Sequence, residues 1–106
     1  MLIYKILRAP EWAAMQADGH TDGAPVDLRD GFIHLSTGPQ LAGTLDRHFA
    51  GEEDLTLLAC DAEALAGDLR WEEARGGQLF PHLFRSLRLS DVVWTRPARD
   101  AGQLPR

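Results

Sequence analysis

Apolar residues recur along this chain with two periods, and each period predicts a type of element. The β-rich run Leu2–Leu7 predicts an N-terminal strand. The nearly continuous apolar run Leu55–Cys60 predicts a strand covered on both faces, and therefore a central one. Leu69–Glu73 alternates over only two steps, which predicts an edge strand. Val92–Thr95 predicts a last strand, ended by Arg96-Pro97.

Two main helices are predicted in the first half of the chain. The first opens at Ala9–Trp12, where proline and glutamate suit a first helical turn, and it ends at Gly19. The second covers Gln40–Phe49, where leucine, leucine and phenylalanine recur at every fourth position. Between them His20–Gly31 shows no periodicity, and its glycine, proline and aspartate residues predict a surface loop. Further along, Asp61 is suited to cap a short helix.

The segment Gly31–Pro39 places a histidine on a predicted strand that leads into a predicted helix. Strand alternation puts Phe32 and His34 on the same face. Ser36 or Thr37 supplies an oxygen that can cap the helix, and the proline that ends the segment suits its first turn. Because the N–H groups of a helix start favour anions, this segment predicts a place for a phosphate, a carboxylate or a ribose.

A second segment, Gln78–Phe84, repeats the Phe-x-His pattern at Phe80 and His82. Pro81 predicts that this strand is an edge strand or carries a bulge, and the turn Arg75–Gly77 before it permits positive φ. Imidazoles exchange protons and hydrogen bonds near neutral pH, and a neighbouring aromatic ring supplies a flat wall for a base. Two such histidines in one cleft predict a small-molecule site. Alternatively, each is a half-buried histidine bonded to a backbone carbonyl.

Other charged residues in the second half of the chain add weaker signals. Arg70, Arg75 and Arg85 can each receive a phosphate through two hydrogen bonds, although scattered arginines are often ordinary surface residues. The neighbouring glutamates at positions 72 and 73 are typical of a solvated edge. If one of them faces the cleft, Glu73 is the one predicted, because it shares a strand face with Trp71.

The remaining histidines and the cysteine favour structural roles. His48 lies near the end of the second predicted helix, where the helix dipole favours a cation, and His20 is predicted to be solvated. Cys60 follows apolar residues and predicts a buried, inert thiol. No local metal-ligand spacing, nucleophile elbow or phosphate-binding glycine loop is present, so no metal is expected. A hydrolase that used Ser36 or Thr37 as nucleophile ranks last.

The composition fits one small domain. The pattern predicts the α+β class over residues 1–97, with a mixed or largely antiparallel sheet, whole or split, and a weakly ordered tail over residues 98–106. With 16 acidic and 11 basic residues the net charge is -5, which offers no general attraction for nucleic acid or anionic membrane. The single cysteine suits a reducing compartment. With no signal peptide or membrane span in the sequence, a cytoplasmic protein is expected.

Four segments resemble the family of small bacterial proteins filed as domain of unknown function 952. These segments are Ile3–Lys5, Asp30–Thr37, Arg70–Glu72 and Leu79–Phe84. Phe84 stands where the family has a tyrosine. More distantly, the chain is similar to the ADP-ribosyltransferase fold, in which a split sheet holds NAD in a cleft.

This resemblance implies that His34 contacts a ribose and that His82 takes a place that other members give to tyrosine, as in RNA 2′-phosphotransferases. Leu35 stands where the fold has a small residue, and no late-strand glutamate that activates an acceptor is identifiable. The implied cleft binds NAD or a related nucleotide, and the implied activity is ADP-ribosyl or related glycosyl transfer. Its predicted contact residues are His34, Ser36, Thr37, Arg75, Phe80 and His82, with His34 and His82 as catalytic candidates. The alternative is a non-catalytic ligand-binding or protein-interaction domain with structural histidines.

Overall fold

The computed structural model describes residues 1–104, except for the side chain of residue 103. The elements follow one another as β1 (Leu2–Arg8), α1 (Ala9–Asp18), β2 (His20–Thr21), α2 (Pro25–Asp30), β3 (Ile33–His34), β4 (Ser36–Thr37), α3 (Leu41–His48), β5 (Leu55–Asp61), α4 (Ala62–Leu65), η1 (Ala66–Asp68), β6 (Leu69–Glu73), η2 (Arg75–Gly77), β7 (Leu79–Leu83), β8 (Leu87–Arg88), η3 (Leu89–Asp91), β9 (Val92–Pro97) and η4 (Ala98–Gln103).

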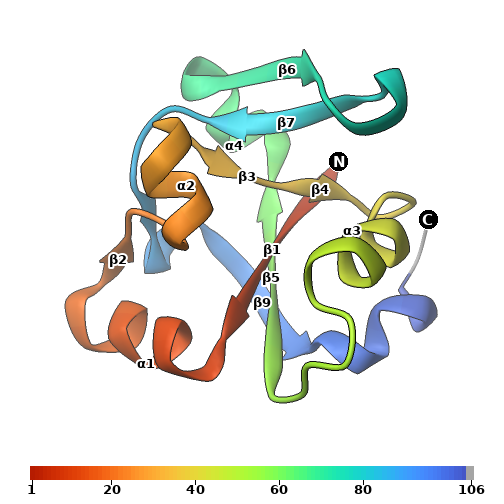
Figure 1. Cartoon of the computed structure of the whole chain (residues 1–106). Helices are drawn as coiled ribbons and strands as arrows, with labels where there is room; N and C mark the ends of the chain where they lie inside the picture. Colours follow the sequence, from red (N-terminus) through yellow and green to blue (C-terminus); the bar gives the residue numbers. More distant parts are fainter. Residues whose placement is uncertain (105–106) are drawn as a thin grey trace.

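The strands form a four-stranded sheet, a three-stranded sheet and a short pair. The four-stranded sheet has the order β4-β1-β5-β9, the three-stranded sheet has the order β3-β7-β6, and β2 pairs with β8. All pairings within residues 1–104 are antiparallel. The chain crosses between the two sheets over residues 33–37, where β3 is followed directly by β4 (Figure 1). The predicted α+β class is confirmed, with antiparallel sheets.

The core lies on both faces of β5, which pairs with β1 on one side and β9 on the other. Leu58 and Cys60 pack on one face with Ile3 and Leu7 of β1, whereas Leu57 and Ala59 belong to a second cluster on the other face. Both faces of β5 are thus covered, and the predicted central strand is confirmed. Side chains of β1 likewise alternate between the two faces, because Tyr4 and Ile6 belong to the second cluster.

Several predictions drawn from short stretches of sequence are confirmed. Gly19 ends α1 in the left-handed conformation, and the Asp61 carboxylate accepts a hydrogen bond of 3.0 Å from the backbone N–H of Glu63 at the start of α4. The segment Leu69–Glu73 forms β6 at the edge of its sheet. The turn before β7 has positive φ at Gly76 and at its neighbour 77, as predicted.

The prediction of a loop over His20–Gly31 is wrong, because this stretch contains β2 and α2. Proline occupies the first turn of α2, and Gly31 ends the helix with φ 83°. The six-residue helix buries a single residue, Asp27, instead of an apolar stripe. Its sequence therefore lacks the periodicity by which helices are recognised.

The predicted helix start at Ser36 or Thr37 is also wrong. Both residues form β4, which pairs with β1, and α3 begins only at Leu41 after a turn in which the Gln40 N–H donates to the Thr37 carbonyl at 3.1 Å. No side chain caps this helix. The anion-favouring helix start expected directly after His34 is therefore absent from the described chain.

Pro81 lies on the central strand of the three-stranded sheet, not at the edge or bulge that its presence predicted. Its carbonyl accepts the Leu35 N–H at 3.0 Å, but its ring nitrogen has no hydrogen to return. The adjacent strand β3 already ends at His34. The N–H that Pro81 lacks would thus fall beyond the end of β3, where the chain leaves this sheet.

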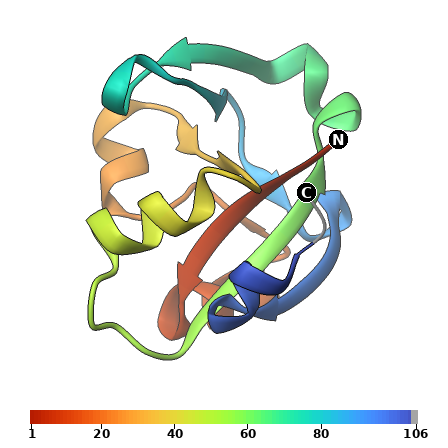
Figure 2. The same ribbon diagram turned by 90° about the vertical axis from the view of Figure 1, so that its right-hand side faces the viewer.

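The C-terminal segment differs from the predicted weakly ordered tail. Residues 98–103 form η4, and Ala98 and Leu104 are buried in the cluster that contains Leu57 and Tyr4. Figure 2 shows η4 lying across the four-stranded sheet. The burial of two apolar side chains explains the difference. The part of the prediction that concerns residues 105–106 lies outside the described residues.

We expect Leu57→Ala to lower the free energy of unfolding by about 2–5 kcal/mol, because its fully buried side chain would leave a cavity between packed neighbours. Leu79→Ala removes the same atoms from a strand residue that is 53% exposed, and it is expected to cost less than about 1 kcal/mol. Urea denaturation of both variants provides the measurement. Equal losses would contradict the assignment of the core to β5.

Candidate functional site

A cleft opens between α2 and α3, along the uncovered edge of β1. Because β4 pairs only with Ile3 and Tyr4, the segment Lys5–Arg8 has no neighbouring strand on that side among the described residues. Figures 1 and 2 place α2 and α3 on the same face of the molecule. The cavity has a volume of about 870 Å³, which is within the range of small-molecule sites.

Five of the six predicted contact residues line this cleft, namely His34, Ser36, Arg75, Phe80 and His82. The ring centroids of His34 and His82 are 5.3 Å apart, and the two residues are direct partners in the pairing of β3 with β7. Thr37 does not line it, because its side chain alternates away from that of Ser36; its backbone N–H donates to Gln40 Oε1 at 3.0 Å.

The aromatic rings do not form the open wall that the sequence predicted. Phe32 stacks on His82 with 4.2 Å between centroids and packs against His34 at 4.6 Å, so it supports both imidazoles from behind. Phe80 lines the cleft, but the Arg75 guanidinium lies 4.9 Å from its centroid. A ligand base reaches the face of Phe80 only if Arg75 moves.

A buried carboxylate outside the predicted contact residues, Asp27, positions His34. Its Oδ1 accepts from the His34 backbone N–H at 3.0 Å and lies 2.6 Å from the His34 ring nitrogen Nδ1. Its Oδ2 accepts from Lys5 Nζ at 2.6 Å and from the Ala24 N–H at 2.7 Å. Burial alone would raise the pKa of Asp27, but the His34 hydrogen bond and the Lys5 charge lower it to about 2.

The ionised Asp27 carboxylate only accepts hydrogen bonds, so His34 Nδ1 carries a proton and donates it to Oδ1. Lys5 Nζ also donates to the His34 carbonyl at 3.1 Å. The backbone N–H, the carbonyl and one ring nitrogen of His34 are all fixed. The other ring nitrogen, Nε2, lies 3.1 Å from Oδ2 of the exposed Asp30 at the end of α2. This is the nitrogen through which His34 can meet a ligand.

His82 has a carboxylate partner too, but it is Glu72 and not the predicted Glu73. His82 Nδ1 lies 2.9 Å from Glu72 Oε1. The register explains the error, because Glu72 pairs directly with Phe80, and directly paired residues point to the same face as each other. Phe80 and His82 share that face on β7. The site therefore holds two histidines, each oriented by a carboxylate through Nδ1.

One signal in the sequence identifies the missed pair. Lys5 shares a strand face with Ile3 and Leu7, so it points inward from a buried strand, and its side chain is only 6% exposed. A buried ammonium requires a carboxylate partner. The aspartates of the segment His20–Gly31 were the nearest unassigned acids around the predicted site, and Asp27 is the one that meets Lys5.

The Ser36 hydroxyl is already engaged. Its Oγ lies 2.9 Å from Thr44 Oγ1, which donates to the Gln40 carbonyl and accepts from Arg75 Nη2 at 3.3 Å. Ser36 must therefore be the donor to Thr44, and this contact does not activate it as a nucleophile. Cys60 is no better candidate, because burial, the largest effect, raises its pKa to about 12.

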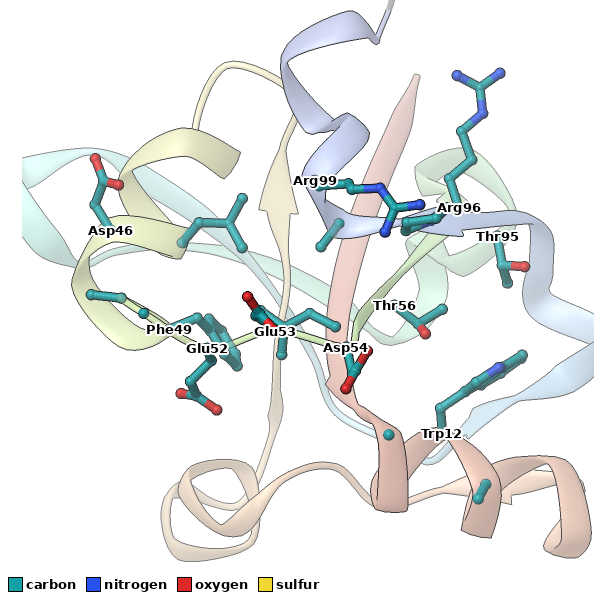
Figure 3. Close-up of a pocket in the computed structure, with 18 of the residues that line it drawn as sticks. Trp12, Asp46, Phe49, Glu52, Glu53, Asp54, Thr56, Thr95, Arg96 and Arg99 are labelled. Atoms are coloured by element: carbon teal, nitrogen blue, oxygen red, sulfur yellow. The ribbon is translucent and has the colours of Figure 1, made fainter.

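A second hollow of about 1050 Å³ lies between α1, the connection from α3 to β5 and the end of β9. Figure 3 shows Glu53 and Asp54 in this hollow, between Trp12 on one side and Arg99 on the other. None of the predicted site residues lines it, and its described lining includes no histidine. The larger hollow is thus separate from the histidine chemistry.

Over the described part of the chain, no group of three or more His, Cys, Asp or Glu residues is arranged to hold a metal ion. The helices of that part are all too short or too polar to cross a membrane.

We expect the Asp27 carboxyl group to titrate near pH 2 in the folded protein, below its ordinary value of 3.8. A lowered pKa stabilises the fold above the ordinary value, and this contribution, about 2 kcal/mol, is lost as the pH falls from about 4 to 2. Carboxyl ¹³C NMR of the unmodified protein measures the midpoint directly. A midpoint at or above 4 would show that Lys5 and His34 do not stabilise the ionised form.

Comparison with known proteins gives one consistent family. Residues 6–95 match the family described as protein of unknown function, DUF952. The crystal structure of protein CC0527 from Caulobacter crescentus is 50% identical and has a TM-score of 0.88, with 92% of this chain and 85% of that chain covered. Its solution NMR structure is 45% identical over 97% and 96% of the two chains, with a TM-score of 0.84.

No functionally curated protein matches the chain. The resemblance to ADP-ribosyltransferases stays a prediction. The family match spans most of the chain, including both histidine segments and the buried Asp27. The chain belongs to the DUF952 family.

Proposed function

We propose that the cleft binds NAD or an ADP-ribose-containing nucleotide, with a ribose held at His34 and His82. The observation that carries this proposal is the pair of carboxylate-oriented imidazoles, with centroids 5.3 Å apart, in one cavity. With Nδ1 engaged in each ring, Nε2 is the nitrogen left for ligand hydroxyls. In His34 a ligand hydroxyl would replace the contact of Nε2 with Asp30 Oδ2 at 3.1 Å. Neighbouring hydroxyls on a ribose suit two such groups at this separation.

The rest of the cavity suits the other parts of such a ligand. Its volume of about 870 Å³ accommodates a molecule of nucleotide size. Apolar side chains from β1, α2 and the segment between β3 and β4 supply surface for a base; they are Tyr4, Ile6, Val26 and Leu35. Cleft-lining arginines are present for an anionic group.

The proposal is binding and not ribosyl transfer, because the cleft offers no carboxylate ready to activate an acceptor. The acidic residues among its described lining are Glu11 and Asp30. Glu11 lies 3.7 Å from the Arg8 guanidinium, and Asp30 pairs with Arg29 at 2.9 Å. Glu72 is engaged with His82. Transfer chemistry would need a base that is not already committed.

Structural histidines are the competing explanation, and loss of stability does not separate the two. His34 is one of the donors to the buried Asp27, so replacing it by alanine is expected to destabilise the protein whether or not it binds a ligand. Binding must be measured directly, in a variant that keeps the contact with Asp27. Asparagine does this, because its amide nitrogen takes the position of Nδ1.

We expect calorimetric titration of the unmodified protein with NAD or ADP-ribose to show binding. His34→Asn removes Nε2 and is expected to weaken that binding about tenfold or more, as the loss of a hydrogen bond to a hydroxyl implies. His20→Ala is the control, since His20 is exposed and lies outside the cleft. No heat with either ligand, from protein shown to be folded by circular dichroism, rejects the proposal.

A further inference from the structure

The cleft carries positive charge in a chain whose net charge is -5. Five basic residues line it, against two acidic ones. The basic residues are Lys5, Arg8, Arg29, Arg47 and Arg75, and the acidic ones are Glu11 and Asp30. This concentration of cations is local and opposite in sign to the net charge of the chain. It therefore suits an anionic group of a ligand bound in the cleft.

Carboxylates within the protein neutralise three of these five cations. Lys5 pairs with Asp27 at 2.6 Å. Arg8 pairs with Glu52 at 2.7 Å, and Arg29 pairs with Asp30 at 2.9 Å. The two that remain are Arg47 and Arg75, for which no carboxylate lies within 4.0 Å among the described residues.

These two arginines lie at the same end of the cleft. Arg47 belongs to the last turn of α3, next to His48, which also lines the cavity. Arg75 belongs to η2, and its Nη2 reaches Thr44 on α3 at 3.3 Å. Burial and the charge of Arg47 both lower the pKa of Arg75. Burial lowers the pKa of His48 most, followed by the charges of Arg75 and Arg47 and then those of His34 and Lys5. The positive charges of Arg47 and Arg75 therefore repel each other and disfavour a charged His48.

We propose that this end of the cleft, formed by Arg47, His48 and Arg75, is a phosphate-binding subsite that takes the diphosphate of the ligand. An anion between α3 and η2 would relieve the repulsion and accept hydrogen bonds from both guanidinium groups. A guanidinium has five N–H donors, and Thr44 accepts from only one nitrogen of Arg75. The inference deepens the proposed function and rests on it for the identity of the whole ligand.

The subsite also specifies how the ligand is oriented. The imidazoles of His34 and His82 lie on β3 and β7, whereas the unpaired arginines lie on α3 and η2. A single ligand with its ribose at the histidines and its phosphate at the arginines would lie across the cleft, from β3 and β7 to α3 and η2. A nucleoside without phosphate would occupy only the histidine end.

The test uses inorganic pyrophosphate as the probe, titrated at low ionic strength and followed by ¹H–¹⁵N NMR of the full chain. We expect binding to the unmodified protein with shifts at residues 44–48 and 74–76. Arg47→Gln and Arg75→Gln should each weaken it about tenfold, the usual consequence of losing a charge-assisted hydrogen bond. Arg99→Gln is the matched control, because it removes the same charge from the separate hollow of Figure 3.

Equal weakening in all three variants, or no binding of pyrophosphate, overturns the subsite. If Arg75→Gln does not fold, Arg47→Gln alone decides. A parallel titration with NAD separates the two proposals. Pyrophosphate that binds through the arginines while NAD does not bind leaves the subsite standing and rejects the proposed ligand. NAD that binds equally to the unmodified protein and to both cleft variants supports the proposed function and rejects the subsite.

Discussion

The Asp27 carboxylate holds together three segments of the chain, one of them 22 residues away in the sequence. It joins Lys5 on β1 of the four-stranded sheet, Ala24 at the start of α2 and His34 on β3 of the three-stranded sheet. Breaking a buried ion pair typically costs about 3–5 kcal/mol, because one charge is left without a partner. This one group therefore helps to fix the relative position of the two sheets and of α2, which borders the cleft.

Elements that depend on local chemistry or on one strong period could be predicted from the sequence. The apolar run of β5, the glycine that ends α1 and the aspartate that caps α4 each act within a few residues. Helix α2 could not be predicted in this way, because Lys5, twenty residues upstream of α2, stabilises its buried Asp27. The edge position predicted from Pro81 was wrong for a similar reason. The hydrogen bond that Pro81 cannot donate falls where β3 ends, and the end of β3 is set by pairing between strands distant in the sequence.

In the candidate site, too, some features could be predicted from local sequence and others depend on distant contacts. The two Phe-x-His patterns identified His34 and His82 as residues on strands, and the structure brings them into one cleft. Their carboxylate partners come from α2 and β6, and only strand register decides that Glu72 and not Glu73 faces His82. Phe32 was expected to form a wall for a ligand base. This was wrong because its ring stacks on His82 instead of being exposed to the cavity.

The direct succession of β3 and β4 limits how the molecule can move. Five extended residues span at most about 17 Å, so this segment sets a short covalent limit on the separation of the two sheets. Hinge opening of one sheet away from the other is thereby restricted, unlike in proteins whose two halves are joined by a long flexible connection. Access to the cleft then depends on α1, α2, α3 and the turn at η2, which border it and lie outside the two sheets.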